Sequence, residues 1–196
     1  MYDYLIKIIL IGSTNVGKTT FRSQITNKTL TDTSSTIGVE LDTAITCATD
    51  GNTIKVQLFD TAGQEFYHAI VKNYYRDIAG AIFMFDLSAY ETFLDIQKFW
   101  INEFETHNQV YIKNILIGNK SDLKRKVNYN EAKKFAEKHN MEYYEISTLQ
   151  ENNFYYFDIF IESIYLNKPE IIKEGIGIKK YQKHYQSPTK TCCNIQ

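Results

Sequence analysis

The chain has 196 residues, of which 43% are hydrophobic, and this combination suits one domain with a single buried core. Its formal net charge is −1, which argues against general nucleic-acid binding. The three cysteines indicate no disulfide framework, as expected in a reducing, cytosolic setting, and we expect neither a signal peptide nor a membrane span.

Strand-like and helix-like segments alternate along the chain. The segments with strand patterns are 4–11, 39–48, 53–60, 80–86, 112–118 and 142–146. The segments with apolar residues at helical spacing are 20–28, 90–107, 129–140 and 151–167. The Asp50-Gly51 pair predicts a hairpin between the second and third strands. This alternation predicts an α/β fold with a mostly parallel six-stranded sheet, one antiparallel edge strand and helices on both faces.

The alternating pattern ends at Asn167. The remaining residues are rich in lysine and are interrupted by glycine and proline, a composition typical of flexible linkers. We therefore predict one domain over residues 1–167 and a flexible tail over residues 168–196. In a sheet of this kind ligands bind beyond the carboxyl ends of the strands, and every motif described below falls at such an end.

The segment Gly12–Thr19 matches the pattern G-x-x-x-x-G-K-[ST]. It follows a predicted strand and opens a predicted helix, which is the context that identifies a P-loop, so we expect a P-loop NTPase fold. Backbone N–H groups and the helix N-terminus would face the phosphates, Lys18 would reach the β- and γ-phosphates, and the Thr19 hydroxyl would bind Mg²⁺. The nucleotide-binding residues expected here are Ser13, Thr14, Asn15, Val16, Gly17, Lys18, Thr19 and Thr20.

The metal and the γ-phosphate need further partners. Asp60 ends the third predicted strand, where a carboxylate can join the Mg²⁺ shell. Gly63 can offer its N–H to the γ-phosphate, and Gln64 can orient the attacking water as the catalytic residue. Thr36 lies in the polar stretch 31–38 and can give its hydroxyl to Mg²⁺ and its N–H to the γ-phosphate. The D-x-x-G pattern alone is weak, because it also occurs in ordinary turns.

A second group of motifs indicates which base is bound. Asn119-Lys120-Ser121-Asp122 follows the fifth predicted strand. The Asp122 carboxylate can accept two parallel hydrogen bonds from guanine, whereas adenine lacks this donor pair. The Lys120 stem can cover one face of the base. Further residues expected at the base are Leu123, Ser147, Thr148 and Leu149.

The three motifs, in this order, resemble the Ras superfamily of small GTPases and, within it, the Rab family. The resemblance covers about residues 4–167, and its Rab-like segments are Thr36–Glu40, Lys55–Glu65, Tyr74–Arg76 and, more weakly, Glu91–Phe93. It implies that residues 31–38 and 62–76 are the two switches. It also implies an effector surface, which would include Ile37, Gly38, Leu41, Phe59 and Tyr74.

The family resemblance implies a switch between GTP and GDP that uses Mg²⁺ and hydrolyses GTP slowly in the regulation of vesicle traffic. No arginine finger in cis is evident, so we expect a GTPase-activating protein to accelerate hydrolysis. The other implied partners are an exchange factor, a GDP-dissociation inhibitor or escort protein, and effectors. We expect a monomer that binds no nucleic acid and cycles between the cytosol and the cytoplasmic face of intracellular membranes.

The chain departs from the Rab pattern at several positions. Leu41 and Phe59 stand where Phe and Trp are usual, and Phe66 stands where Arg is usual. Switch I is one residue short, and Leu30 replaces an aromatic residue that often supports the base. Leu149 replaces the lysine whose stem normally lies against guanine. We therefore predict weaker nucleotide binding and faster GDP release than is usual for the family.

The last residues resemble a double-cysteine prenylation signal, formed by Cys192 and Cys193. Cys193-Asn-Ile-Gln also fits the general prenylation box, whose final Gln favours farnesyl over the geranylgeranyl groups of the Rab pattern. Two lipid chains would satisfy the rule that stable membrane anchoring needs two signals. The tail lysines, which would add attraction to an anionic leaflet, are Lys179, Lys180, Lys183 and Lys190.

Two other function classes remain open. The altered switches and base motif also fit a scaffold that binds partners without cycling between nucleotides, since function is argued from the site and not from the fold. The intact Lys18, Thr19, Thr36, Asp60 and Gln64 argue against it. A P-loop kinase or ATPase is disfavoured by the guanine-reading motif.

Overall fold

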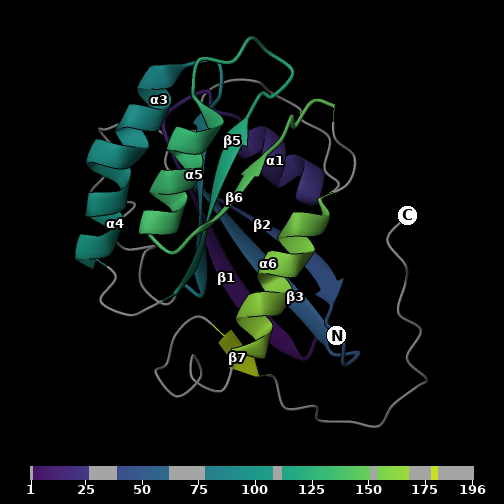
Figure 1. Cartoon of the computed structure of the whole chain (residues 1–196). Helices are drawn as coiled ribbons and strands as arrows, with labels where there is room; N and C mark the ends of the chain where they lie inside the picture. The colour runs from purple at the N-terminus through teal and green to yellow at the C-terminus, as the bar shows by residue number, and fades with distance from the viewer. Residues whose placement is uncertain are drawn as a thin grey trace, which may run out of the picture.

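The computed structural model (Figure 1) describes residues 2–26, 39–61, 78–107, 112–150, 154–167 and 178–180. Its strands are β1 (Tyr4–Ile11), β2 (Val39–Cys47), β3 (Thr53–Thr61), β4 (Gly80–Asp86), β5 (Lys113–Asn119), β6 (Glu142–Glu145) and β7 (Ile178–Lys180). Its helices are α1 (Lys18–Ile25), α3 (Tyr90–Asp95), η2 (Ile96–Trp100), α4 (Ile101–His107), α5 (Tyr129–Lys138) and α6 (Tyr155–Leu166). Each of the six predicted strands is present within one residue of its predicted bounds.

The strands β1 to β6 lie in one sheet in the order β2-β3-β1-β4-β5-β6. All neighbouring pairs in this order are parallel except β2 and β3, which form the predicted antiparallel hairpin at the edge. Figure 1 shows α3, α4 and α5 on one side of the sheet and α1 and α6 on the other. The predicted α/β fold with helices on both faces is therefore confirmed.

The sheet has a seventh strand that was not predicted. β7 pairs antiparallel with the start of β1, where Ile178 lies opposite Ile6 and Lys180 opposite Tyr4. On that side β4 pairs with β1 only from Ile8 onward, so the first residues of β1 offer an open edge. A strand of three residues is too short to show a period in the sequence, and the open edge decides where it pairs.

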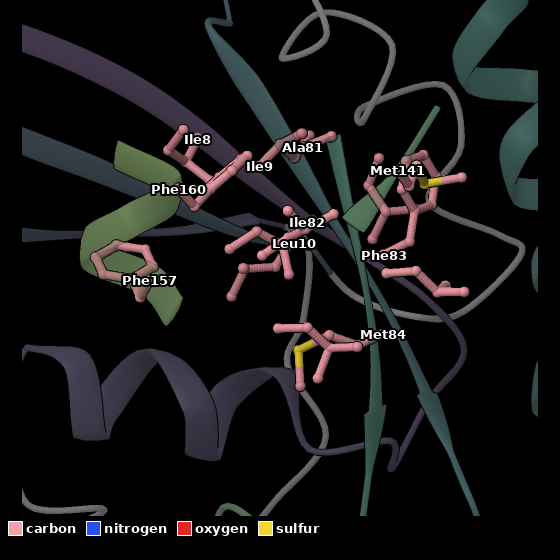
Figure 2. Packing of buried hydrophobic residues seen from close by; sticks show 14 of the residues in the cluster. Ile8, Ile9, Leu10, Ala81, Ile82, Phe83, Met84, Met141, Phe157 and Phe160 are labelled. Carbon is pink, nitrogen blue, oxygen red and sulfur yellow. The ribbon is translucent and has the colours of Figure 1, made fainter. Parts of the chain in front are cut away.

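The core lies between the sheet and its two helical layers. β4 is buried along its whole length and β1 along nearly all of it, as expected for central parallel strands covered on both faces. Figure 2 shows Phe160 of α6 close to Ile8 and Ile9 of β1, with Phe157 on the same helix. This packing holds the strands rigidly and thereby positions the loops at their carboxyl ends.

The predicted helix over 90–107 is continuous in space but not uniform. A π-helical turn, η2, separates α3 from α4. Such turns often mark functional positions. No described helix is both long and apolar enough to cross a bilayer.

Candidate functional site

The predicted motifs meet at one edge of the sheet because their strands are parallel. In the β1–β3 pair, Leu10 lies opposite Asp60, and in the β4–β5 pair, Asp86 lies opposite Asn119. The P-loop follows β1 directly, Asp60 lies near the end of β3, and Asn119 ends β5. The structure therefore brings the phosphate, metal and base motifs together, as the sequence predicts.

Lys18 is the first residue of α1, and its side chain reaches back to the phosphate loop that precedes the helix. Its side chain is buried, and its Nζ donates hydrogen bonds to the carbonyl oxygens of Gly12 at 2.7 Å and Ser13 at 2.8 Å. Burial lowers the pKa of Lys18 to about 8, although the negative charge of Asp60 opposes this shift. The loop thus holds an ammonium that is poorly solvated, and phosphate oxygens would stabilise its charge strongly.

Gly17 is the residue that lets the loop pack against the base motif. It caps the start of α1 with φ of +101°, a backbone conformation that favours glycine. A Cβ atom added to Gly17 would lie 2.2 Å from Nδ2 of Asn119. Only glycine therefore permits this contact between the phosphate loop and the end of β5.

Asn119 joins three segments of the site. Its fully buried amide donates to the Val16 carbonyl at 2.8 Å and to the Thr148 hydroxyl at 3.2 Å. Its Oδ1 accepts from the Thr148 N–H at 3.1 Å. Asn119 was predicted as a base-site residue, and the structure shows that it also fastens the phosphate loop to the turn after β6. The motif pattern carries no signal for this second role.

Asp95 and Trp100, which were not predicted, support the phosphate loop through Ser13. Ser13 donates from Oγ to Oδ2 of Asp95 at 2.6 Å, and it accepts a hydrogen bond from Nε1 of Trp100 at 3.3 Å. Asp95 ends α3, and Trp100 ends the π-helical turn η2. The turn therefore directs two side chains of one long helix toward the loop. Helical periodicity alone could not have shown this, because a π turn changes the register.

The predicted metal ligands Thr19 and Asp60 are in contact. The Thr19 hydroxyl donates to Oδ2 of Asp60 at 2.7 Å, and Asp60 is fully buried. Burial raises the pKa of Asp60, against the hydrogen bond from Thr19 and the positive charges of Lys18 and Arg22. Its second oxygen, Oδ1, has no hydrogen-bond partner within the part of the chain that the structure describes. A hydroxyl beside a carboxylate with an unsatisfied oxygen fits the oxygen ligands that Mg²⁺ requires.

The base motif is divided between buried and exposed residues. Ser147 and Thr148 are buried, whereas Asp122 and Leu123 are exposed and Leu149 is 77% exposed. Lys120 has φ of +62°, and its Nζ lies 2.7 Å from Oδ2 of Asp86. Burial raises the pKa of Asp86, but hydrogen bonds from Lys120 and Ser88 outweigh it, so the pKa lies below its ordinary value. This ion pair fixes the Lys120 stem, and the carboxylate of Asp122 faces solvent.

The remaining predicted residues fall into two groups. Leu41 of β2 lies directly opposite Phe59 of β3, so these two predicted effector residues are neighbours on the sheet. Leu41 is 51% exposed. The predicted residues that lie outside the described part of the chain are Thr36, Ile37, Gly38, Gly63, Gln64, Tyr74, Cys192 and Cys193.

Comparison with known proteins decides the family. A model of the Ras family matches residues 7–165. Ras-related protein Rab-11A from Dictyostelium discoideum is 45% identical over 155 residues, which are 78% of this chain and 72% of that protein. The chain belongs to the Ras family. The prediction of a Rab-type small GTPase within the Ras superfamily is confirmed, and this Ras-family chain is an enzyme that hydrolyses GTP to GDP and phosphate.

Members of the Ras family bind GTP or GDP together with Mg²⁺, and the geometry of this Ras-family chain suits those ligands. The buried ammonium of Lys18 would suit the phosphates, and the contact between Thr19 and Asp60 would suit the metal. Asn119 fastens the phosphate loop to the turn after β6, where further residues of the predicted base site lie. Each contact comes from a different strand end, so the fold is what assembles the site.

Proposed function

We propose that this GTPase is a Rab-type switch that regulates vesicle traffic at the cytoplasmic face of intracellular membranes. The observation that supports a working nucleotide switch is the contact between the Thr19 hydroxyl and the buried Asp60 carboxylate beside the P-loop lysine. A nucleotide-free scaffold would have no use for a buried, partly unsatisfied carboxylate at this position, because such a group costs stability.

In the proposed reaction, Lys18 binds the β- and γ-phosphates of GTP, and the N-terminus of α1 faces them. Thr19, Asp60 and Thr36 would hold Mg²⁺, which neutralises charge that develops on the phosphates. Gln64 orients a water molecule for attack on the γ-phosphorus, and the bond to the β–γ bridging oxygen breaks to leave GDP. Without an arginine finger in cis, a rate on the order of 10⁻⁴ s⁻¹ is expected, with acceleration by a GTPase-activating protein.

The proposed switch releases GDP faster than is usual for its family. Leu149 is 77% exposed at the position where the family usually has a lysine that lies against guanine. A short branched apolar side chain offers less cover for the base than a long aliphatic stem. The Lys120 stem, which is held by Asp86, would then cover the base from one face only.

The proposed membrane attachment uses Cys192 and Cys193, each carrying a prenyl group, at the end of a lysine-rich tail. The proposed partners are an exchange factor, a GTPase-activating protein, a GDP-dissociation inhibitor or escort protein, and effectors that contact Leu41 and Phe59. Replacing both cysteines with serine is expected to move the protein from the membrane fraction to the cytosol. A double variant that remains on membranes would contradict this attachment.

The nucleotide that co-purifies with the full chain tests the proposed function. We expect GDP or GTP, released faster when Mg²⁺ is chelated. Asp122→Ala is expected to reduce the preference for GTP over ATP by at least about 100-fold, because the guanine donors lose their acceptor. Lys124→Ala, at an exposed neighbouring position, serves as the control and should leave the preference unchanged. Absence of bound nucleotide, with no preference for GTP over ATP, would support the scaffold instead.

A further inference from the structure

Arg22 lies beside the metal site without belonging to any of the predicted motifs. It is on α1, one turn after Thr19, and it is buried. Its Nη1 lies 3.5 Å from Oδ2 of Asp60 and 2.5 Å from Oε2 of Glu40. Its Nε lies 3.6 Å from Oδ2 of Asp42. Among the described residues, the guanidinium thus has three carboxylate neighbours.

A buried arginine is not an obvious choice for the stability of this fold. Taking its charge out of water costs several kcal/mol, which the ion pairs offset, and apolar residues often replace buried ion pairs without loss. α1 already packs against α6 through Phe21, so that packing does not depend on Arg22, which lies instead against carboxylates of β2 and β3. The position of the Arg22 charge next to Asp60 therefore indicates that Arg22 acts on the site.

We propose that Arg22 is an internal counter-cation for the metal-binding carboxylate of Asp60. It stabilises Asp60 when Mg²⁺ has left, and it repels Mg²⁺ when the metal is bound. Both effects make the protein less dependent on Mg²⁺ for holding nucleotide. The inference rests on the proposed metal site formed by Thr19 and Asp60.

The geometry supports competition between the two cations. Oδ2 of Asp60 accepts the Thr19 hydroxyl at 2.7 Å and lies 3.5 Å from Nη1 of Arg22, so the arginine lies beside the carboxylate that would bind the metal. Two like charges a few ångströms apart in a poorly solvated site repel each other appreciably. Glu40 and Asp42 hold the guanidinium and cancel part of its charge. Within the described part of the chain, Lys18 is a second cation that faces Asp60, and the phosphates would occupy it.

The size of the effect follows from this partial cancellation. An uncompensated unit charge beside a divalent cation would change Mg²⁺ affinity by far more than tenfold at an effective dielectric constant of about 20. Because Glu40 and Asp42 offset part of the Arg22 charge, removal of Arg22 together with Asp42 is expected to change Mg²⁺ affinity by only about tenfold.

Two variants separate a charge effect from a structural one. Arg22→Leu with Asp42→Ala removes the buried pair together, and Glu40, which is 52% exposed at its side chain, can be solvated. Asp42→Asn keeps the shape of Asp42 but frees more of the Arg22 charge to act on Asp60. The full-length protein is loaded with a fluorescent GDP analogue, and its release is followed against free Mg²⁺ and in excess chelator. Thermal melting reports the fold of each variant.

In the double variant, the GDP release rate should be half-way between its Mg²⁺-free and Mg²⁺-saturated values at about tenfold lower free Mg²⁺ than in the wild type. Chelation should accelerate GDP release about tenfold more in the double variant than in the wild type. Asp42→Asn should shift the Mg²⁺ midpoint the other way, by about threefold. A double variant that folds but needs the same or more free Mg²⁺ than the wild type would overturn the inference, because loss of the Arg22 charge must favour the metal. A wild-type release rate that ignores Mg²⁺ would overturn the proposed metal site itself.

Discussion

Asn119→Ala is the substitution that tests the assembly of the site most directly. The wild-type amide makes three hydrogen bonds in a fully buried position, to the Val16 carbonyl and to the hydroxyl and N–H groups of Thr148. Truncation leaves the Val16 carbonyl and the Thr148 N–H without this partner. Each buried group left in this way costs about 1–3 kcal/mol, so we expect a loss of about 3 kcal/mol in the free energy of unfolding. For a domain of this size, that lowers Tm by roughly 6–12 °C.

Thermal melting of nucleotide-stripped and GDP-saturated protein measures this effect in two parts. The loss in stripped protein reports the hydrogen bonds alone. A larger loss in excess GDP and Mg²⁺ would report weakened nucleotide binding as well, because bound ligand stabilises only the folded state. Asn102→Ala is the matched control, since Asn102 is exposed and its side-chain amide donates to the Lys98 carbonyl one turn away at 2.9 Å.

The control variant should stay within about 0.5 kcal/mol of the wild type. Equal melting temperatures for Asn119→Ala and Asn102→Ala in stripped protein would refute the bridging role of Asn119. In that case the side chain of Asn119 would not couple the phosphate loop to the turn after β6.

Two further predictions follow from the same region. Gly17→Ala should destabilise the protein by more than about 3 kcal/mol, because its Cβ would meet Asn119 Nδ2 at 2.2 Å, whereas Gly51→Ala, with φ of +80° and nothing within 4 Å, should cost only about 1–2 kcal/mol. Equal losses in urea unfolding would contradict the steric argument. Arg125→Ala should lower stability by about 0.5–1 kcal/mol at neutral pH by removing the bidentate pair with Glu145. Burial raises the pKa of Glu145, but hydrogen bonds from the guanidinium and a neighbouring tyrosine outweigh it and lower the pKa. The stability from this pair is therefore fully present above the ordinary pKa of 4.5, and the difference between Arg125→Ala and wild type should shrink as pH falls through the lowered pKa of the folded protein. An undiminished difference in acid would contradict this cause.

The sequence alone predicted six of the seven described strands and located the motifs at strand ends. Apolar runs and turn residues are local properties, so each predicted strand from β1 to β6 was found within one residue of its bounds. The G-x-x-x-x-G-K-T pattern, Asp60 and Asn119 could be assigned from their position at strand ends, because the geometry of parallel sheets places such ends together. The Ras-family comparison agrees with this assignment.

Only the tertiary structure showed which residues serve the site through contacts between distant segments. Arg22 beside Asp60 and Trp100 beside Ser13 join residues that are 38 and 87 positions apart, and no periodicity encodes such pairs. β7 was likewise decided by the open edge at the start of β1, not by its own three residues. Local patterns determined what each segment is. Long-range packing determined which charged and polar groups share a buried space, because burial is a property of the whole fold and not of any segment within it.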